Sequence, residues 1–240
     1  MEAVLSNPKV FKDMVDVISQ IIDEGVFTFS ESGLEFLAPD RATVAVIHAR
    51  IPASSFESYT CSGEEKVGLN IPAFLTVLKR ASGKLGLRTE GDRLEVTIYG
   101  ASTRKFSLPI LEINQEVPPV SKFQFSASLT VASRILEEGI NDADIVGDSV
   151  VFELSGEKFV MRAEGPTSSV EITAEKGAGL SSISGEARAR YPLDYLKKFV
   201  KALRMAENTR VQLSTDYPVK LEVERNDAYI SLILAPRVEE

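Results

Sequence analysis

The chain has 240 residues, of which 44% are hydrophobic and 26% are charged, and its formal net charge is -8 at pH 7. This is a globular composition, long enough for one large domain or two smaller ones, and no apolar stretch approaches the roughly 18 residues that span a bilayer. The single cysteine, Cys61, excludes an internal disulfide, and the negative charge argues against a protein that coats itself with nucleic acid.

The first half of the sequence predicts a mixture of helices and strands. Apolar residues recur at helical spacing in residues 8–23 and predict a first helix, and a second helix is expected at residues 71–81. Short runs bounded by turn residues predict strands between and after these helices. In chain order the strands are expected at residues 26–29, 34–38, 43–51, 84–89, 93–99 and 103–108.

A proline-containing segment separates the two halves. It follows Pro109, contains Pro118 and Pro119, and fits neither the helical nor the strand period. We expect an extended connector at residues 110–122, between an N-terminal domain of residues 1–109 and a C-terminal domain of residues 123–240.

The second half repeats the order of the first. Helices are expected at residues 127–139 and 192–205, and strands at residues 150–154, 158–164, 168–173, 210–214, 219–224 and 229–234. Short fragments recur as well, since Ser32-Gly33 matches Ser155-Gly156 and Ile71-Pro72 matches Tyr191-Pro192. The sequence therefore predicts a duplicated α+β domain, each copy with two helices and an antiparallel sheet.

Basic residues gather on corresponding helices of the two halves. Residues 71–89 contain basic residues and no acidic one, and the helix expected at 192–205 has an apolar face and a separate basic face. Such segregation, opposite in sign to the whole chain, is expected of a surface that faces a polyanion, although a solvated helix face is the alternative. The residues expected to face DNA phosphates are Lys12, Lys79, Arg80, Lys84, Arg134, Lys197, Lys198, Lys201 and Arg204.

Little in the sequence favours catalysis. His48 is the one histidine, no cysteine cluster could bind zinc, and neither a phosphate-binding loop nor a dinucleotide-binding fingerprint occurs. The acidic residues of 142–153 partly match a calcium loop, but Val146 stands where an oxygen ligand belongs. We expect no catalytic residue, no metal and no cofactor. The least favoured alternative is a metal-dependent hydrolase that uses Asp142, Asp144 and Asp148.

Several fragments in fixed order carry a resemblance to a known family. They are Ser32-Gly33-Leu34 leading into Pro39-Asp40, then Leu87-Arg88-Thr89-Glu90, Asp216-Tyr217-Pro218, and the ending Leu234-Ala235-Pro236-Arg237-Val238-Glu239-Glu240. With them the chain resembles proliferating cell nuclear antigen, the sliding clamp of eukaryotes and archaea, over its whole length, and it looks more archaeal than eukaryotic. It departs from the pattern at Pro39, often methionine in relatives, and at the pair Pro118-Pro119.

The resemblance implies a non-catalytic ring of three subunits that encircles double-stranded DNA without reading its sequence. It implies that the ring tethers DNA polymerase, flap endonuclease and DNA ligase, and that a clamp loader opens it. Three identical chains are favoured, although different sister subunits are an alternative. The location would be the cytoplasm in an archaeon or the nucleus in a eukaryote, with no membrane partner. A scaffold that binds protein but not DNA remains the other reading.

The resemblance also implies two kinds of contact surface. Rings of this family close by pairing edge strands, and by position these are residues 103–108 and 168–173, with Arg104, Lys105 and Phe106 meeting Val170 and Glu171. Apolar residues in the extended connector are expected to dock a client peptide with a glutamine and aromatics, or else to staple the connector in place. The expected peptide pocket comprises Pro39, Val44, Val46, Ile110, Leu111, Ile113, Pro218, Ala235 and Pro236.

Overall fold

The computed structural model describes residues 1–114, 116, 117 and 119–237. It divides into two compact units. Unit 1 comprises Met1–Arg41, Ile47–Val117 and Arg225–Ile230, and unit 2 comprises Ala42–Val46, Pro118–Glu224 and Ser231–Glu240. The division passes through three strands, β4 (Ala45–Pro52), β17 (Val219–Arg225) before its last residue, and β18 (Ala228–Leu234).

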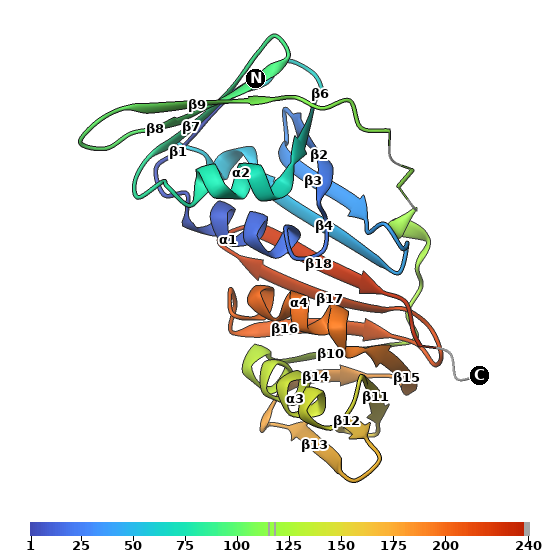
Figure 1. Cartoon of the computed structure of the whole chain (residues 1–240). Helices are drawn as coiled ribbons and strands as arrows, with labels where there is room; N and C mark the ends of the chain where they lie inside the picture. Colours follow the sequence, from blue (N-terminus) through green and yellow to red (C-terminus); the bar gives the residue numbers. More distant parts are fainter. Residues whose placement is uncertain (115, 118, 238–240) are drawn as a thin grey trace. The chain divides into compact units, whose positions relative to one another are not determined.

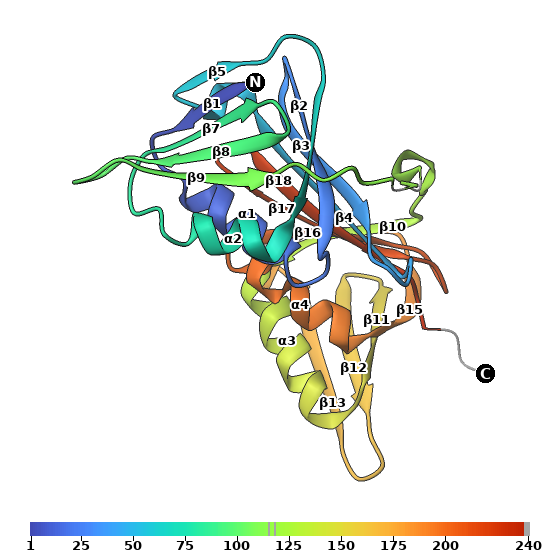
Figure 2. The same ribbon diagram turned by 45° about the horizontal axis from the view of Figure 1, so that its top comes forward.

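Unit 1 contains two helices, α1 (Lys9–Ile18) and α2 (Ile71–Leu78), which pack against each other (Figures 1 and 2). A five-stranded sheet has the order β5 (Ser58–Thr60), β1 (Glu2–Leu5), β7 (Leu85–Glu90), β8 (Arg93–Ile98) and β9 (Arg104–Pro109). The other strands are β6 (Glu65–Asn70), β2 (Glu24–Ser30) and β3 (Gly33–Pro39), with β4 next to β3. A short 3-10 turn, η1, covers Ala53–Ser55.

The sequence explains why these two helices form and meet. Helix α1 buries Phe11, Met14 and Ile18, which recur every three or four residues and so lie on one face. Helix α2 begins where the Asn70 side chain accepts a hydrogen bond from the backbone N–H of Ala73 at 2.9 Å, which satisfies an otherwise unpaired donor. Phe11 and Phe74 then pack edge to face, with their ring centroids 5.9 Å apart.

Unit 2 contains the helices α3 (Ser133–Val146) and α4 (Leu193–Leu203), which also pack against each other (Figures 1 and 2). Its sheet begins with β15 (Ala187–Pro192), β11 (Ser149–Ser155), β12 (Lys158–Glu164) and β13 (Ser169–Lys176). It continues with β14 (Gly179–Ser184), β10 (Ala127–Ala132), β16 (Asn208–Leu213), β17 (Val219–Arg225) and β18. A second 3-10 turn, η2, covers Val120–Lys122.

The two units have the same order of elements and the same strand pairing. In both, one strand and a helix precede five strands, a second helix and three more strands. Strand β1 pairs with β5 and β7, as β10 pairs with β14 and β16. Strand β2 pairs with β3 and β6, as β11 pairs with β12 and β15. The predicted α+β fold with a repeated unit is thereby confirmed.

One predicted helix is wrong in its first half. Residues 127–132 were expected to be helical, but they form β10, and α3 begins at Ser133 and continues to Val146. In β10 the buried residues alternate with half-buried ones, as the two-residue period of a strand requires. The strand pairs on both sides, with β14 and β16, so tertiary hydrogen bonds override the local helical pattern.

Five further strands were missed: β1, β5, β6, β14 and β15. They are three to six residues long, and several contain glycine, serine or charged residues that weaken a strand signal. Each is specified by its neighbours in the sheet, which the sequence pattern does not reveal.

Candidate functional site

The residues of unit 1 that were predicted to face DNA lie around the C-terminal end of α2. Lys79 and Arg80 follow the helix and are exposed, and the Lys79 ammonium lies 3.4 Å from an Asp16 carboxylate oxygen. Lys12 donates a hydrogen bond to the Ala81 carbonyl at 2.7 Å, so it ties α1 to the end of α2. Lys84 pairs with Glu57. In the part of unit 1 that the structure describes, Arg80 makes no ion pair, and its charge is available to a ligand.

The residues of unit 2 that were predicted to face DNA lie on α3 and around α4, and several are neutralised by acidic residues of α3. Arg134 pairs with Glu138, Lys197 with Asp144 and Arg204 with Glu137, each at 2.6 Å. Lys198 instead places its ammonium 4.9 Å from the centre of the Tyr195 ring. All of these basic residues and Lys201 are exposed. The cationic surface of unit 2 is therefore weaker than its lysines and arginines alone suggest.

The sequence prediction counted basic residues without their acidic neighbours. The pair Arg134 and Glu138 is spaced four residues apart on one helix and could have been recognised from the sequence. The partners of Lys197 and Arg204 come from the other helix of the pair, so only the packing of α3 on α4 brings them together. Exposed cations with loose partners can hold a phosphate backbone without fixing its register.

The predicted edge strands have open sides within their units. Strand β9 ends its five-stranded sheet and, among the described residues, pairs with β8 alone. Strand β13 pairs with β12 along residues 169–175, whereas its register with β14 covers Glu175 and Lys176. Residues 169–174 therefore leave one row of backbone groups unpaired by strands in the described part of unit 2. Such edges are templates for pairing with another chain.

The predicted interface residues alternate along these edges. On β9, Arg104 and Phe106 are half-buried while Lys105 is exposed, and on β13, Val170 is half-buried while Glu171 is exposed. Within the chain Lys105 pairs with Glu95 at 3.1 Å, and Glu171 with Arg162 at 2.7 Å. Subunit pairing through these residues stays a prediction.

The first residues of the connector are held on unit 1 by backbone hydrogen bonds. The N–H of Ile110 donates to the Asp92 carbonyl and that of Leu111 donates to the Gly68 carbonyl, both at 2.8 Å. A side chain at Gly68 would collide with the Leu111 carbonyl oxygen, so glycine is required for this close approach. The sequence left two roles open for these residues, docking of a client peptide and attachment of the connector. The hydrogen bond from Leu111 to Gly68 attaches the connector to unit 1.

We expect Gly68→Ala to loosen the connector, because a Cβ atom there displaces the Leu111 backbone. Thermal unfolding should occur at a lower temperature, with a loss of about 1–3 kcal/mol in the free energy of unfolding. Limited proteolysis should cut the connector faster. Gly100→Ala is the matched control, because an added Cβ meets no atom closer than 3.9 Å there. Equal protease resistance in the two variants would contradict this account of the connector.

Two of the predicted pocket residues meet in unit 1. Pro39 and Ile113 line an open pocket of about 290 Å³, together with Ile21 and Ile22 at the end of the segment after α1. Its polar lining consists of Asp23, Glu24, Asp40, Arg41 and Asn114. The sequence reasoning missed the contribution of the α1 end, because residues 19–23 were assigned to the helix.

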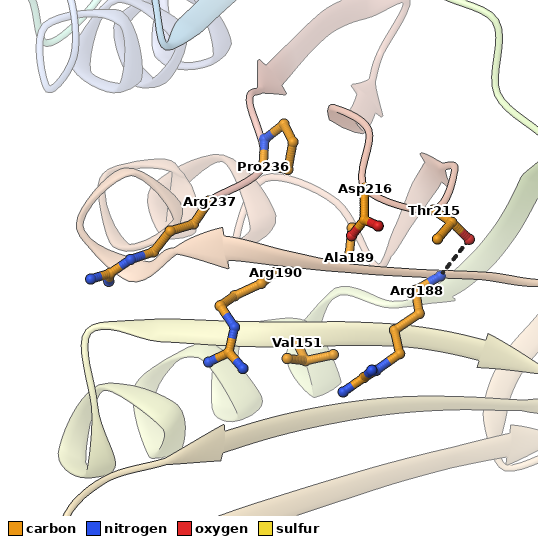
Figure 3. Close-up of a pocket in the computed structure, with 8 residues that line it drawn as sticks. All are labelled: Val151, Arg188, Ala189, Arg190, Thr215, Asp216, Pro236 and Arg237. Carbon is orange, nitrogen blue, oxygen red and sulfur yellow. Dashed lines mark hydrogen bonds between the residues drawn. The ribbon is translucent and has the colours of Figure 1, made fainter. Parts of the chain in front are cut away.

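Other predicted pocket residues lie in unit 2. Ala235 donates its N–H to the Val44 carbonyl at 2.9 Å, and Pro218 is half-buried beside the turn at Asp216. Pro236 lines a second open pocket of about 400 Å³ (Figure 3). Val46 is only 6% exposed, so its side chain offers little surface to a peptide. The peptide pocket as a whole draws on both units and stays a prediction.

Residues considered for catalysis have structural partners. The Nε2 atom of His48 lies 2.6 Å from a Glu35 carboxylate oxygen, and the His48 ring packs edge to face on Tyr229. Asp142 and Asp144 belong to α3 and not to a turn, and Asp144 pairs with Lys197. Asp148 accepts a hydrogen bond from Arg237, which holds the pKa of Asp148 below its usual range.

Two other kinds of feature are absent from the described part of the chain. No three His, Cys, Asp or Glu side chains converge there as a metal site would require. None of its helices is long and apolar enough to cross a membrane.

Comparisons with known proteins point to one family. The family profile for the N-terminal domain of proliferating cell nuclear antigen matches residues 1–107. A DNA polymerase sliding clamp of Thermococcus sibiricus is 33% identical over 246 residues, which cover 100% of this chain and 99% of that protein. One of Pyrococcus abyssi is 31% identical with the same coverage.

Solved structures match equally well. The crystal structure of PCNA from Thermococcus kodakaraensis superposes with a TM-score of 0.91 and 26% identity, over 98% of this chain and 99% of that one. A structure of the C-terminal region of FEN-1 bound to A. fulgidus PCNA matches with a TM-score of 0.90 and 26% identity, over 100% of this chain and 99% of that one. The chain belongs to the proliferating cell nuclear antigen family of DNA polymerase sliding clamps.

Proposed function

We propose that this chain is one subunit of a DNA sliding clamp, a ring of three that encircles double-stranded DNA and tethers replication and repair enzymes to it. One observation carries the proposal: a duplicated unit, each copy with a packed helix pair bearing exposed basic residues, in a chain that aligns end to end with DNA polymerase sliding clamps. The chain acts by enclosure and not by catalysis.

The physical requirement on such a subunit is a weak contact with phosphates. Retention on DNA comes from topological linkage, so the inner surface needs to attract the duplex without binding any one position. Exposed lysines and arginines, several of them partly neutralised by nearby carboxylates, meet that requirement. The acidic residues that make the chain negative overall then lie on other surfaces of the ring. There they limit binding to DNA outside the ring.

The edge strands support assembly by strand addition. Strand β9 and residues 169–174 of β13 have free pairing sides and opposite charges at Lys105 and Glu171. We propose that three identical chains close the ring. A solved PCNA2–PCNA3 complex of Sulfolobus tokodaii, whose matching chain is 26% identical to this one, shows that different chains of the family can associate. Mass measurement on the purified chain alone distinguishes the two.

Client docking follows from the same family. The FEN-1 fragment bound to A. fulgidus PCNA is the precedent for a nuclease client. We propose DNA polymerase, flap endonuclease and DNA ligase as clients, and a clamp loader to open the closed ring around DNA. The predicted peptide pocket is the docking surface. In an archaeal cell the ring works in the cytoplasm at the nucleoid.

The decisive experiment measures DNA synthesis on primed DNA of two topologies. With a loader and a partner polymerase, the chain should lengthen products severalfold on circular primed DNA. On linear DNA with free ends the effect should be lost, because a ring slides off. Equal stimulation on both templates would refute enclosure, and no stimulation on either would favour a scaffold that binds protein but not DNA.

A further inference from the structure

Three arginines surround the open pocket of about 400 Å³ in unit 2 (Figure 3). Arg188 and Arg190 come from β15, and Arg237 follows Pro236 near the end of the chain. The rest of the lining is Val151, Ala189, Thr215, Asp216 and Pro236. The lining thus contains three basic residues and one acidic residue. Of the arginines, Arg237 is paired with Asp148 at 2.7 Å and Arg190 donates to the Ser149 hydroxyl at 3.4 Å.

This pocket opens on the face of the sheet that points away from α3. A side chain at Gly139 of α3 would collide with Met161, so α3 covers the face to which Met161 belongs. Met161 stands opposite Phe152, and Phe152 opposite Ala189, which assigns these residues to that covered face. Val151 and Arg190 face each other in the next register position, on the other side.

Hydrogen bonds hold two loops against the edge strand β15 at the border of the pocket. One loop contains Thr215 and Asp216, and the other contains Arg237. The N–H of Asp216 donates to the Arg188 carbonyl at 3.1 Å, and the N–H of Arg237 donates to the Arg190 carbonyl at 2.7 Å. The N–H of Arg188 donates to the Thr215 hydroxyl at 3.3 Å. These bonds occupy backbone groups that an added strand would need. A ligand here is therefore recognised by side chains.

In the described part of unit 2, Arg188 forms an ion pair with Glu153 and shares that carboxylate with Arg162. Glu153 lies 3.6 Å from the Arg188 Nε atom, but Glu153 is already bound by Arg162 at 2.5 Å. The Arg188 side chain is 64% exposed and keeps several N–H donors for a ligand. In Figure 3 the side chains of Arg188 and Arg190 extend from β15 on either side of Val151.

We propose that this pocket reads a carboxylate side chain of a client peptide, with Arg188 as the main recognising residue. A guanidinium presents a planar fork of N–H donors that matches the two oxygens of a carboxylate, whereas a neutral amide offers one acceptor. Val151 and Pro236 supply an apolar floor for the stem of a glutamate side chain. Pro236 also belongs to the predicted peptide pocket, so the inference rests on the proposed function.

A peptide carboxylate fits this pocket better than a DNA phosphate. In unit 2 the exposed basic residues proposed to contact DNA lie on α3 and around α4, and the pocket opens on the face turned away from α3. Its volume of about 400 Å³ suits one side chain and a neighbouring turn, and is too small for a duplex.

The test compares two synthetic peptides that carry the client motif of glutamine and aromatics and differ at one position. One keeps the glutamine, and the other has glutamate in its place. Calorimetric titration of the full chain should give about tenfold tighter binding of the glutamate peptide, since a charge-assisted bond replaces a neutral one. Arg188→Gln should abolish this preference, while Arg210→Gln, an exposed arginine on β16, should keep it.

Each other result has a defined meaning. If both peptides bind equally to the full chain, carboxylate recognition is refuted and client docking stands. If neither binds, client docking fails with it. If a preference survives Arg188→Gln, another residue reads the charge. If a short DNA duplex displaces the glutamate peptide, the pocket is a phosphate site. If the preference appears only after removal of residues 238–240, the chain's own acidic end is the occupant. Each of these five results overturns the proposal as stated.

Discussion

The double variant Arg104→Glu, Lys105→Glu should sediment as a monomer under conditions in which the unaltered chain sediments as a trimer. Both residues lie on β9, the edge of its sheet, where we place the contact with β13 of a neighbouring subunit. The substitutions would set carboxylates against Glu171, and like charges directly opposite across strands repel. At an interface this costs enough to weaken each contact about 100-fold or more.

Two further variants make this result specific. Arg41→Glu, Lys66→Glu carries the same change of charge at exposed positions away from β9, and it should remain trimeric. Adding Glu171→Arg to the double variant should restore part of the assembly by reversing both partners. Analytical ultracentrifugation measures all three. A double variant that still sediments as a trimer would remove β9 from the interface.

The second large effect concerns DNA. Arg80→Ala, Lys198→Ala should reduce clamp-dependent synthesis on circular primed DNA about tenfold at moderate salt, since phosphate contacts carry most of the affinity. Neither residue has a carboxylate partner within the described residues, so each offers its full charge to a phosphate. Arg134→Ala, Arg204→Ala removes the same formal charge but from residues already paired with Glu138 and Glu137.

The comparison between these two variants is the measurement. The second pair should lose clearly less synthesis than the first, and both should keep the trimeric mass and the thermal stability of the unaltered chain. Raising the salt concentration should reduce the difference, because screening weakens the phosphate contacts of the unpaired residues. If both pairs lose activity equally, the ion pairs with α3 do not limit the charge presented to DNA.

Local patterns in the sequence were enough for much of the fold. Apolar residues at helical spacing placed α1, α2 and α4, and the repeated order of elements gave the duplication. The start of α3 failed because residues 127–132 carry a pattern that suits either period, and pairing with β14 and β16 decided for a strand. The short edge strands and turn-rich strands were missed for the same reason, because pairing with neighbouring strands specifies them.

For the candidate site, too, local properties could be predicted from the sequence and long-range contacts could not. The sequence by itself determined which residues could be basic, apolar or acidic on each helix and strand, since side-chain chemistry and period are local properties. Only the tertiary structure decided which charges are neutralised, because Glu137 and Asp144 reach Arg204 and Lys197 through the packing of α3 on α4. It also brought Arg188, Arg190 and Arg237 around one pocket, through hydrogen bonds between an edge strand and two distant loops. Contacts between residues far apart in sequence depend on the whole fold, and no local pattern encodes them.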